Sequence, residues 1–398
     1  MKIVQLVESH TEKMGYSDVC LPKALSSLGH DMYVVTTTGN SYFSTPEYDD
    51  VFKDFLNEKN ERGEKKLDDY TIHRLDSLKT PFGIYIKNLY KTIKKIKPDI
   101  VQAGELISLS TLQCAVLSIF LPFKFTVECH IHKSVFNVSP LEVNLIKKIK
   151  KFLKKNLYHI QVLITSIMMQ KCYPISKDSY NICNQHFLIP KKKLAIRTLG
   201  TDLSTFFKMK KYPLDFKKSL GFREDDIICI YTGRLTQDKG PHILKDAINF
   251  LQHNGHNKFK GLFIGSGSEI YCEQFKNNKN IKLLPFVEYK KLNKYYNISS
   301  IGVWPKQEST SQIDALASGL CIIINNNSGV KDRAIDSGLF YNEGSHLDLA
   351  NKILQLGDYK FRKQMSNNAM DKSKRIYDWK LIAKEYEVDF KEMIEKQY

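Results

Sequence analysis

The chain alternates between short apolar runs and stretches whose apolar residues recur at helical spacing. Residues 2–7 are typical of a buried strand, and residues 17–28 carry an apolar helical face that ends at Gly29. Further strands are expected at residues 32–37, 71–75, 99–103 and 123–129. Because parallel strands are joined by long crossovers, this alternation predicts a parallel α/β sheet.

The pattern then restarts. Strand candidates, each followed by a helical stretch, lie at residues 226–231, 261–264, 281–284, 301–304 and 321–325. The sequence therefore predicts an α/β protein with two facing Rossmann-like, doubly wound domains, residues 1–205 and 206–378. Their boundary falls near residues 201–218, which are polar and interrupted by Pro213. Ligands of open α/β sheets bind beyond the carboxyl ends of the strands, so we expect a cleft between the domains.

Two segments do not follow this alternation. Residues 44–68 are polar with mixed charges, and we interpret them as a long surface loop or a short helix. Residues 379–398 carry the apolar face of an amphipathic helix, which is expected to pack back towards the first domain.

Composition narrows the function classes. The formal net charge of +17 favours an anionic partner, such as nucleic acid, an anionic membrane surface or a phosphorylated substrate. The eight cysteines form no CxxC pair, so we expect buried reduced thiols rather than a zinc site or disulfides. No signal peptide and no transmembrane helix are expected.

The first segment that predicts chemistry is residues 231–240, YTGRLTQDKG. A strand ends here, Gly233 permits a tight turn, and Arg234 follows the strand directly. Lys239 then precedes a helix that Pro241 helps to start. Two cations beside a helix N-terminus favour a diphosphate site, although a solvated loop with two surface charges is the alternative.

Two later segments repeat this strand, turn and helix arrangement. Residues 263–269, FIGSGSE, include Gly265, although a single GxG is weak and often marks only a tight turn. Residues 304–324 contain a polar turn whose backbone amides, at Thr310 and Ser311, would point into the cleft. Asp314 follows and is predicted to accept hydrogen bonds from ribose hydroxyls; taken alone, it would be a capping or solvated carboxylate.

These segments, in this order, resemble the retaining glycosyltransferases of family 4, which have the GT-B fold. The resemblance rests on Gly233-Arg234-Leu235, Lys239-Gly240 and the run 314–319, DALASG. Residues 15–37 are similar to the family's glycine loop and first helix, and residues 199–207, LGTDLSTFF, to its lead into the second domain. Together they cover nearly the whole chain.

The sequence departs from the family at one signature. Two glutamates separated by seven residues are usual there, whereas this chain has Lys306 and Asp314. Glu308 is a candidate replacement for the first glutamate through a shortened loop. The predicted donor-binding set is Gly15, Gly233, Arg234, Lys239, Gly265, Phe286, Val287, Glu308, Thr310, Ser311 and Asp314.

The resemblance also implies a catalytic set of His130, Arg234 and Lys239. His130 follows a first-domain strand and would contact the donor sugar, although it and His132 could instead cap the strand or face solvent. Arg234 and Lys239 would stabilise the leaving diphosphate. No metal site is expected and no cofactor beyond the nucleotide-sugar donor, UDP- or GDP-linked.

Residues 145–169 form the remaining segment of interest. Six lysines lie between Lys147 and Lys155, and apolar residues recur on one helical face. This pattern predicts a basic amphipathic helix that docks on an anionic membrane, the alternative being a surface helix with solvated lysines. We therefore expect a cytoplasmic protein, peripheral at the inner face of the cell membrane.

The predicted function is a glycosyltransferase that uses a nucleotide sugar and a glycan or lipid-linked acceptor in cell-surface polysaccharide synthesis. A nucleotide-sugar epimerase of the same fold is the alternative. A glycan phosphorylase would need a lysine-bound pyridoxal site, which the sequence does not indicate. Nucleic acid is not an expected partner, because no nucleic-acid-binding module is recognised.

Overall fold

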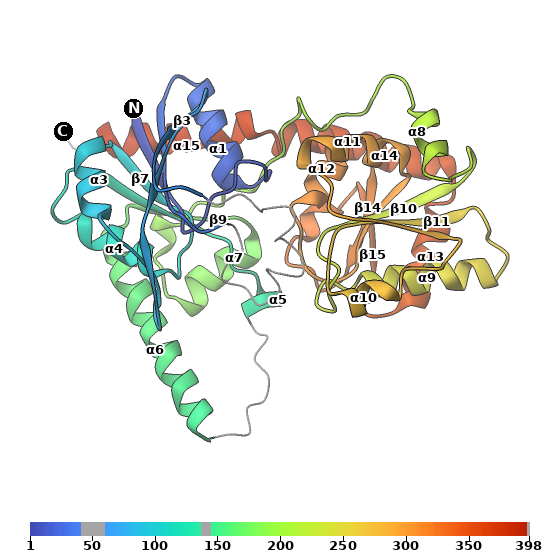
Figure 1. Ribbon diagram of the computed structural model, residues 1–398, viewed down its shortest axis with the longest axis horizontal. Helices are drawn as coiled ribbons and strands as arrows, with labels where there is room; N and C mark the ends of the chain where they lie inside the picture. The colour runs from blue at the N-terminus through green and yellow to red at the C-terminus, as the bar shows by residue number, and fades with distance from the viewer. Residues whose placement is uncertain (41–59, 137–144, 396–398) are drawn as a thin grey trace.

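The computed structural model describes residues 1–40, 60–136 and 145–395 of the chain (Figure 1). Two α/β domains lie side by side, each built on its own sheet. The first sheet has the order β3-β4-β2-β1-β7-β8-β9, and only the edge strand β3 is antiparallel to its neighbour. Its strands are β1 (Lys2–Leu6), β2 (Asp31–Thr37), β3 (Gly63–Lys66), β4 (Thr71–Leu75), β7 (Ile100–Ala103), β8 (Lys124–Cys129) and β9 (Lys171–Pro174).

The second sheet is parallel throughout, with the order β12-β11-β10-β13-β14-β15. Its strands are β10 (Ile227–Thr232), β11 (Phe259–Ile264), β12 (Ile281–Leu284), β13 (Ile301–Trp304), β14 (Cys321–Asn325) and β15 (Gly338–Tyr341). A separate hairpin, β5 (Ser77–Thr80) and β6 (Gly83–Ile86), lies in the first domain. The predicted two-domain, parallel α/β fold is confirmed.

Helices cover the sheets. Those of the first domain are α1 (Ser17–Ser27), α3 (Leu89–Ile96), α4 (Leu109–Leu117), α5 (Lys133–Phe136), α6 (Leu145–Met168) and α7 (Lys177–Asn181). The later helices are α8 (Leu214–Ser219), α9 (Pro241–His253), α10 (Glu269–Glu273), α11 (Leu292–Ile298), α12 (Ser311–Ala317), α13 (His346–Gln355), α14 (Tyr359–Ile376) and α15 (Trp379–Glu395).

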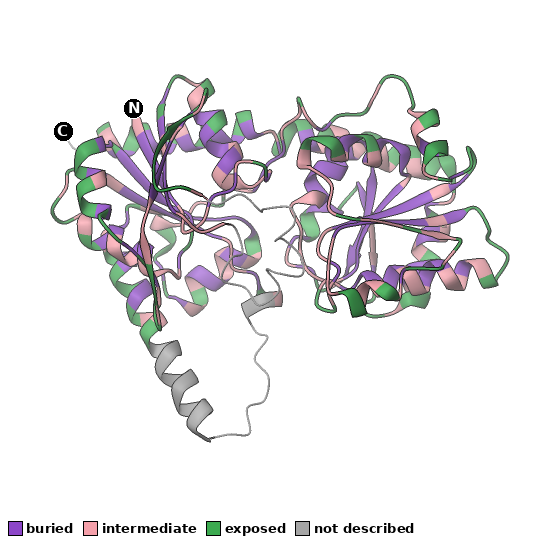
Figure 2. Ribbon diagram, in the orientation of Figure 1, coloured by how far each residue is buried: buried purple, intermediate pink, exposed green. Residues whose placement is uncertain are grey.

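The strands form the core of each domain. Every residue of β7, β13 and β14 is buried, and Figure 2 shows the buried residues concentrated in the two sheets. Such continuous apolar strands are typical of parallel sheets that are covered on both faces. The carboxyl ends of the central strands are consequently the places where polar side chains can gather.

Some elements differ from the expectation. The loop or short helix expected at residues 44–68 is wrong at Gly63–Lys66, which forms β3; residues 44–59 of that segment lie outside the described residues. All four residues of β3 are exposed, so no apolar alternation marks this strand. The strands β9 and β15 are not among the strands that the sequence predicted.

The chain crosses back to the first domain at its end, where α15 contacts α1 (Figure 1). The Tyr386 hydroxyl donates to Glu128 of β8 at 2.9 Å, and Arg197 pairs with Asp389 at 2.5 Å. The helix therefore joins the first domain through buried polar contacts as well as through its apolar face.

Candidate active site

A cavity with a volume of about 550 Å³ lies between the two domains. The first domain lines it with residues that follow β1, β7 and β8, and the second with residues that follow β10 and β13. This is the position expected for a ligand of parallel sheets. Of the predicted site residues, it brings together His130, Gly233, Arg234, Lys239, Phe286, Glu308 and Thr310.

A smaller pocket of about 120 Å³ shares part of this lining. It brings the remaining predicted residues, apart from one, to the same region: Gly15, Val287, Ser311 and Asp314, with Gly233, Phe286 and Thr310 common to both cavities. Gly15 lies against the ring of Tyr289, and a Cβ added to it would come within 2.1 Å of that ring. Gly15 thus allows the first domain to approach the second closely.

Gly265 is the exception, because it lines neither cavity. A Cβ at this position would lie 1.8 Å from the carbonyl oxygen of Gly233, and its φ is +154°. The turns after β10 and β11 therefore touch each other backbone to backbone. The observed contact assigns Gly265 to the support of the Gly233 turn.

Arg234 and Lys239 lie on the second-domain side of the cavity. The Tyr231 hydroxyl donates to the Arg234 carbonyl oxygen at 2.6 Å, and Arg234 pairs with Asp238 at 3.6 Å. The Lys239 ammonium donates to the Glu308 carbonyl oxygen at 3.0 Å. Burial, and then the charge of Arg234, lower the pKa of Lys239 to about 8. An anion bound here would offset both effects, so this side of the cavity is suited to an anionic group.

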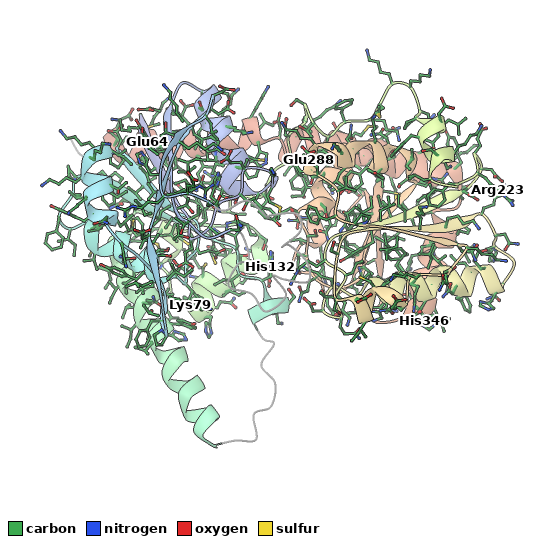
Figure 3. All side chains as sticks on the ribbon, in the orientation of Figure 1. Glu64, Lys79, His132, Arg223, Glu288 and His346 are labelled. Atoms are coloured by element: carbon green, nitrogen blue, oxygen red, sulfur yellow. The ribbon has the colours of Figure 1, made fainter. Side chains whose placement is uncertain are left out.

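Glu308, and not Lys306, lines the cavity. Its carboxylate accepts hydrogen bonds from the Ser134 hydroxyl at 2.6 Å and the Gly329 amide at 2.7 Å. Burial raises the pKa of Glu308, but the charge of His132 and these hydrogen bonds outweigh burial and leave the pKa below its usual value. Figure 3 shows His132 on the side of the first domain that faces the second. Glu308 is thus an ionised link between the domains.

Asp314 is buried in α12 and reaches the smaller pocket. Its Oδ1 accepts hydrogen bonds from the Thr201 hydroxyl at 2.7 Å and the Tyr289 hydroxyl at 3.4 Å. Burial raises the pKa of Asp314 to about 7, although both hydrogen bonds oppose the shift. The carboxyl group therefore binds Thr201, which lies where the first domain leads into the second, and also lines the pocket.

His130 belongs to a hydrogen-bonded group of side chains. Its Nε2 lies 3.1 Å from Glu128 Oε2, while Glu128 Oε1 accepts from Gln102 at 2.6 Å and from Tyr386 at 2.9 Å. Burial lowers the pKa of His130, but the hydrogen bond to Glu128 and the charges of Glu105 and Glu128 outweigh it and raise the pKa to about 9. An imidazolium therefore lies opposite the two cations of the second domain.

Sequence reasoning did not select Glu128, Gln102 or Tyr386. One signal was present for Gln102, which is the polar residue of the otherwise apolar strand IVQA, whereas Glu128 lies in a strand of alternating polar and apolar residues, KFTVEC. Tyr386 gave no such signal, because it lies on the apolar face of a distant helix.

The residues that the structure describes contain no group of three or more His, Cys, Asp or Glu side chains placed to hold a metal ion. All eight cysteines are free thiols, and Cys20 and Cys272 are only partly buried, in contrast to the other six.

Part of the chain matches a known protein family. Residues 214–372 match the family described as Glycosyl transferases group 1. The chain is 23% identical to alpha-monoglucosyldiacylglycerol synthase of Acholeplasma laidlawii over 356 residues, which cover 83% of this chain and 81% of that protein. It is also 25% identical to the capsular polysaccharide biosynthesis glycosyltransferase CapM of Staphylococcus aureus over 215 residues, 49% of this chain and 55% of CapM.

Solved structures share the fold. Sucrose-phosphate synthase from Thermosynechococcus elongatus superimposes with a TM-score of 0.72 and 14% identity over 100% of both chains. Anabaena HepE in complex with UDP and glucose gives a TM-score of 0.70 and 14% identity over 98% of this chain and 99% of HepE. Residues 214–372 therefore resemble the group 1 glycosyltransferases in sequence, and the whole chain has the GT-B fold.

Proposed function

We propose that this protein is a glycosyltransferase, which transfers a sugar from a UDP- or GDP-linked donor to a glycan or lipid-linked acceptor in the synthesis of a cell-surface polysaccharide or glycolipid. The observation that carries the proposal is the cavity in which Arg234 and Lys239 lie across from His130. The names of the two relatives, a glycolipid synthase and a capsular polysaccharide glycosyltransferase, support this acceptor range. The complex of HepE with UDP supports a nucleotide-sugar donor.

In the proposed reaction, Arg234 and Lys239 neutralise the charge that develops on the leaving diphosphate. They need no metal ion to do so, because both are cationic groups beside the N-terminus of α9. His130 binds the donor sugar from the opposite domain. The transfer retains the anomeric configuration, with the acceptor hydroxyl attacking the face from which the diphosphate departs.

We also propose that the enzyme is peripheral at the cytoplasmic face of the cell membrane and docks through α6. The predicted helix at residues 145–169 is confirmed as α6, although the side chains of its lysines lie outside the described residues. In the described part, Ile160, Leu163, Ile164 and Ile167 are exposed at the spacing of one helical face. Such a face buries favourably in the interfacial region of a bilayer.

Two further exposed apolar side chains lie just beyond the end of a helix that contacts α6. Ile119 and Phe120 follow α4, which contacts α6, and they are 62% and 68% exposed. Among the described residues, no helix combines the length and the apolar character needed to cross a bilayer.

A thermal-shift screen across nucleoside diphosphates and their sugars tests the donor. A ligand that binds only the folded protein raises the melting temperature in proportion to its binding free energy. We expect UDP or GDP and one of their sugars to raise it, in the presence of a metal chelator. A screen in which no nucleoside diphosphate stabilises the protein would overturn the proposed donor class.

A further inference from the structure

The first-domain wall of the large cavity contains a buried amide that has no hydrogen-bond partner. Gln5 of β1 is 2% exposed, lines the cavity, and neither its Nε2 nor its Oε1 has a partner among the described residues. Gln5 is the register partner of Gln102 in β7, whose own amide donates to Glu128. A buried amide without partners is unfavourable, so Gln5 is a group that a ligand in the cavity would satisfy.

The same wall carries carboxylates. Glu8, Asp18 and Glu105 all line the cavity from the first domain. Glu8 accepts a hydrogen bond from the Ser110 hydroxyl at 3.1 Å, and Asp18 lies 2.8 Å from the Nδ1 of His10. These contacts leave further lone pairs on each carboxylate, because an ionised carboxyl group has about four acceptor sites. The carboxylates are therefore suited to hydroxyl donors.

Hydroxyl groups complete the wall. Ser108 lies 2.8 Å from Ser110 and donates to Thr111 at 2.9 Å, and all three residues line the cavity. The wall thus offers hydroxyls, carboxylates and one amide to a ligand. A sugar is complementary to such a wall, because each sugar hydroxyl can both donate and accept a hydrogen bond.

Charge divides the cavity into two parts. Arg234 and Lys239 lie on the second-domain side, whereas Glu8, Asp18 and Glu105 lie on the first-domain side. Among the described residues of the first-domain lining, His130 is the one cation, and it is already 3.1 Å from Glu128. A second anionic group placed on this wall would meet like charges at short range and little compensating positive charge.

We propose that this wall binds the acceptor as an uncharged, hydroxyl-rich sugar, and that Gln5 pairs with one of its hydroxyls. The inference rests on the proposed transferase function and names its acceptor class. In the transfer, an acceptor hydroxyl oxygen forms a bond to the anomeric carbon of the donor. The bond from that carbon to the phosphate oxygen breaks, and the hydroxyl proton leaves on the nucleoside diphosphate.

A matched pair of acceptors tests the proposal. Octyl glucoside and octyl glucuronide differ only in that the second carries a carboxylate in place of a hydroxymethyl group. With the donor identified by thermal shift, we expect transfer to octyl glucoside with a kcat/KM at least ten-fold above that for the glucuronide. Dioctanoylglycerol, which offers a hydroxyl but no sugar, is expected to be a poorer acceptor than octyl glucoside.

Two variants connect this preference to the wall. Gln5→Leu should raise the KM for octyl glucoside about ten-fold and leave the donor-induced thermal shift unchanged. Gln161→Leu is the control, because Gln161 is also a buried glutamine but lines neither cavity. Glu8→Gln keeps the size and shape of the side chain and should reduce the discrimination against the glucuronide about ten-fold.

Failure of the acceptor proposal can be distinguished from failure of the transferase function, because donor binding is measured separately by thermal shift. Equal or faster transfer to the glucuronide, or no transfer to any sugar by a protein that still binds its donor, would overturn the acceptor class. A loss of donor binding in Gln5→Leu would also overturn it, since Gln5 would then contact the donor. Should Gln5→Leu not fold, the response of the isosteric Glu8→Gln variant decides the matter.

Discussion

At the residue scale, Arg234 and Lys239 are held close enough for the charge of one to lower the pKa of the other. Removing Arg234 should therefore cost transition-state stabilisation more than folding stability. We expect Arg234→Ala to lower kcat/KM by an amount equivalent to roughly two to four kcal/mol of transition-state stabilisation, by analogy with other preorganised groups that stabilise developing charge. Steady-state release of nucleoside diphosphate measures this.

Arg223→Ala is the matched control, because Arg223 is exposed at the outer edge of the second domain (Figure 3). It removes the same charge from the chain and should leave turnover unchanged. Wild-type kcat/KM in Arg234→Ala would show that the diphosphate does not bind at this turn.

Asp314 is the second residue whose role can be measured. Asp314→Asn should weaken nucleotide affinity more than it slows transfer at saturating donor, because a ribose contact is the same in the ground and transition states. Thr201→Val removes the linker hydrogen bond to Asp314 and keeps the carboxyl group, so it separates the linker role from the ribose role. An unchanged donor affinity with a collapsed kcat in Asp314→Asn would contradict the assignment.

The raised pKa of Asp314 gives the same variant a pH signature. A carboxyl group whose pKa rises on folding, here from 3.8 to about 7, leaves the folded state most stable below the lower value. Between the two values the unfolded chain ionises this carboxyl group while the folded protein keeps it protonated, so stability falls as the pH rises. Relative to Asp314→Asn, the wild type should lose up to about 4 kcal/mol from pH 4 to pH 7, since one pKa unit is about 1.36 kcal/mol.

The sequence predicted those site residues that lie in one local motif. Gly233, Arg234 and Lys239 occur within seven residues, and a strand, turn and helix arrangement is sufficient to bring them together. Glu128, Gln102 and Tyr386 could not be assembled in this way, because 258 residues separate Glu128 from Tyr386. Such contacts depend on how α15 packs, which local periodicity does not determine.

At the scale of elements, α6 carries the membrane proposal. Each lysine near an anionic surface contributes about 1 kcal/mol, and the exposed apolar face of Ile160, Leu163 and Ile167 adds burial. Binding to vesicles should require anionic lipid and should weaken with salt, because screening limits the attraction to roughly 8 Å at physiological ionic strength. Replacing Lys147, Lys148, Lys150, Lys151, Lys154 and Lys155 with glutamine should abolish co-sedimentation.

A control with the same change of charge is available in the second domain. The residues Lys276, Lys279, Lys282, Lys290, Lys291 and Lys294 are all exposed there, and their replacement with glutamine should preserve vesicle binding. If both sets of replacements weakened binding equally, net charge would be responsible and α6 would not be the docking element.

Elements were predicted to different extents. The strands β4, β12, β13 and β14 have the bounds expected from the sequence, because each is a compact apolar run or a clear alternation. The exposed edge strand β3 and the hairpin β5–β6 were missed. The strand β3 is held by backbone hydrogen bonds to β4, and all four of its side chains are exposed, so the sequence carries little pattern there.

At the scale of the whole molecule, both domains contribute to one cavity. The hydrogen bond from Ser134 to Glu308 and the contact of Gly15 with Tyr289 connect them beside it, while α15 returns to the first domain. The division into residues 1–205, 206–378 and 379–398 remains a proposal, which limited proteolysis would test. A cavity shared in this way allows each domain to hold one reactant.

The central claim is that the cavity transfers a sugar to an acceptor, and turnover of the donor with and without acceptor tests it most directly. The account predicts that nucleoside diphosphate and glycosylated acceptor form in equal amounts, and only when acceptor is present. A metal chelator should not change this yield. NMR of the product should show the same anomeric configuration as the donor. Conversion of the nucleotide sugar into a sugar epimer without any acceptor would contradict the account and establish the epimerase alternative.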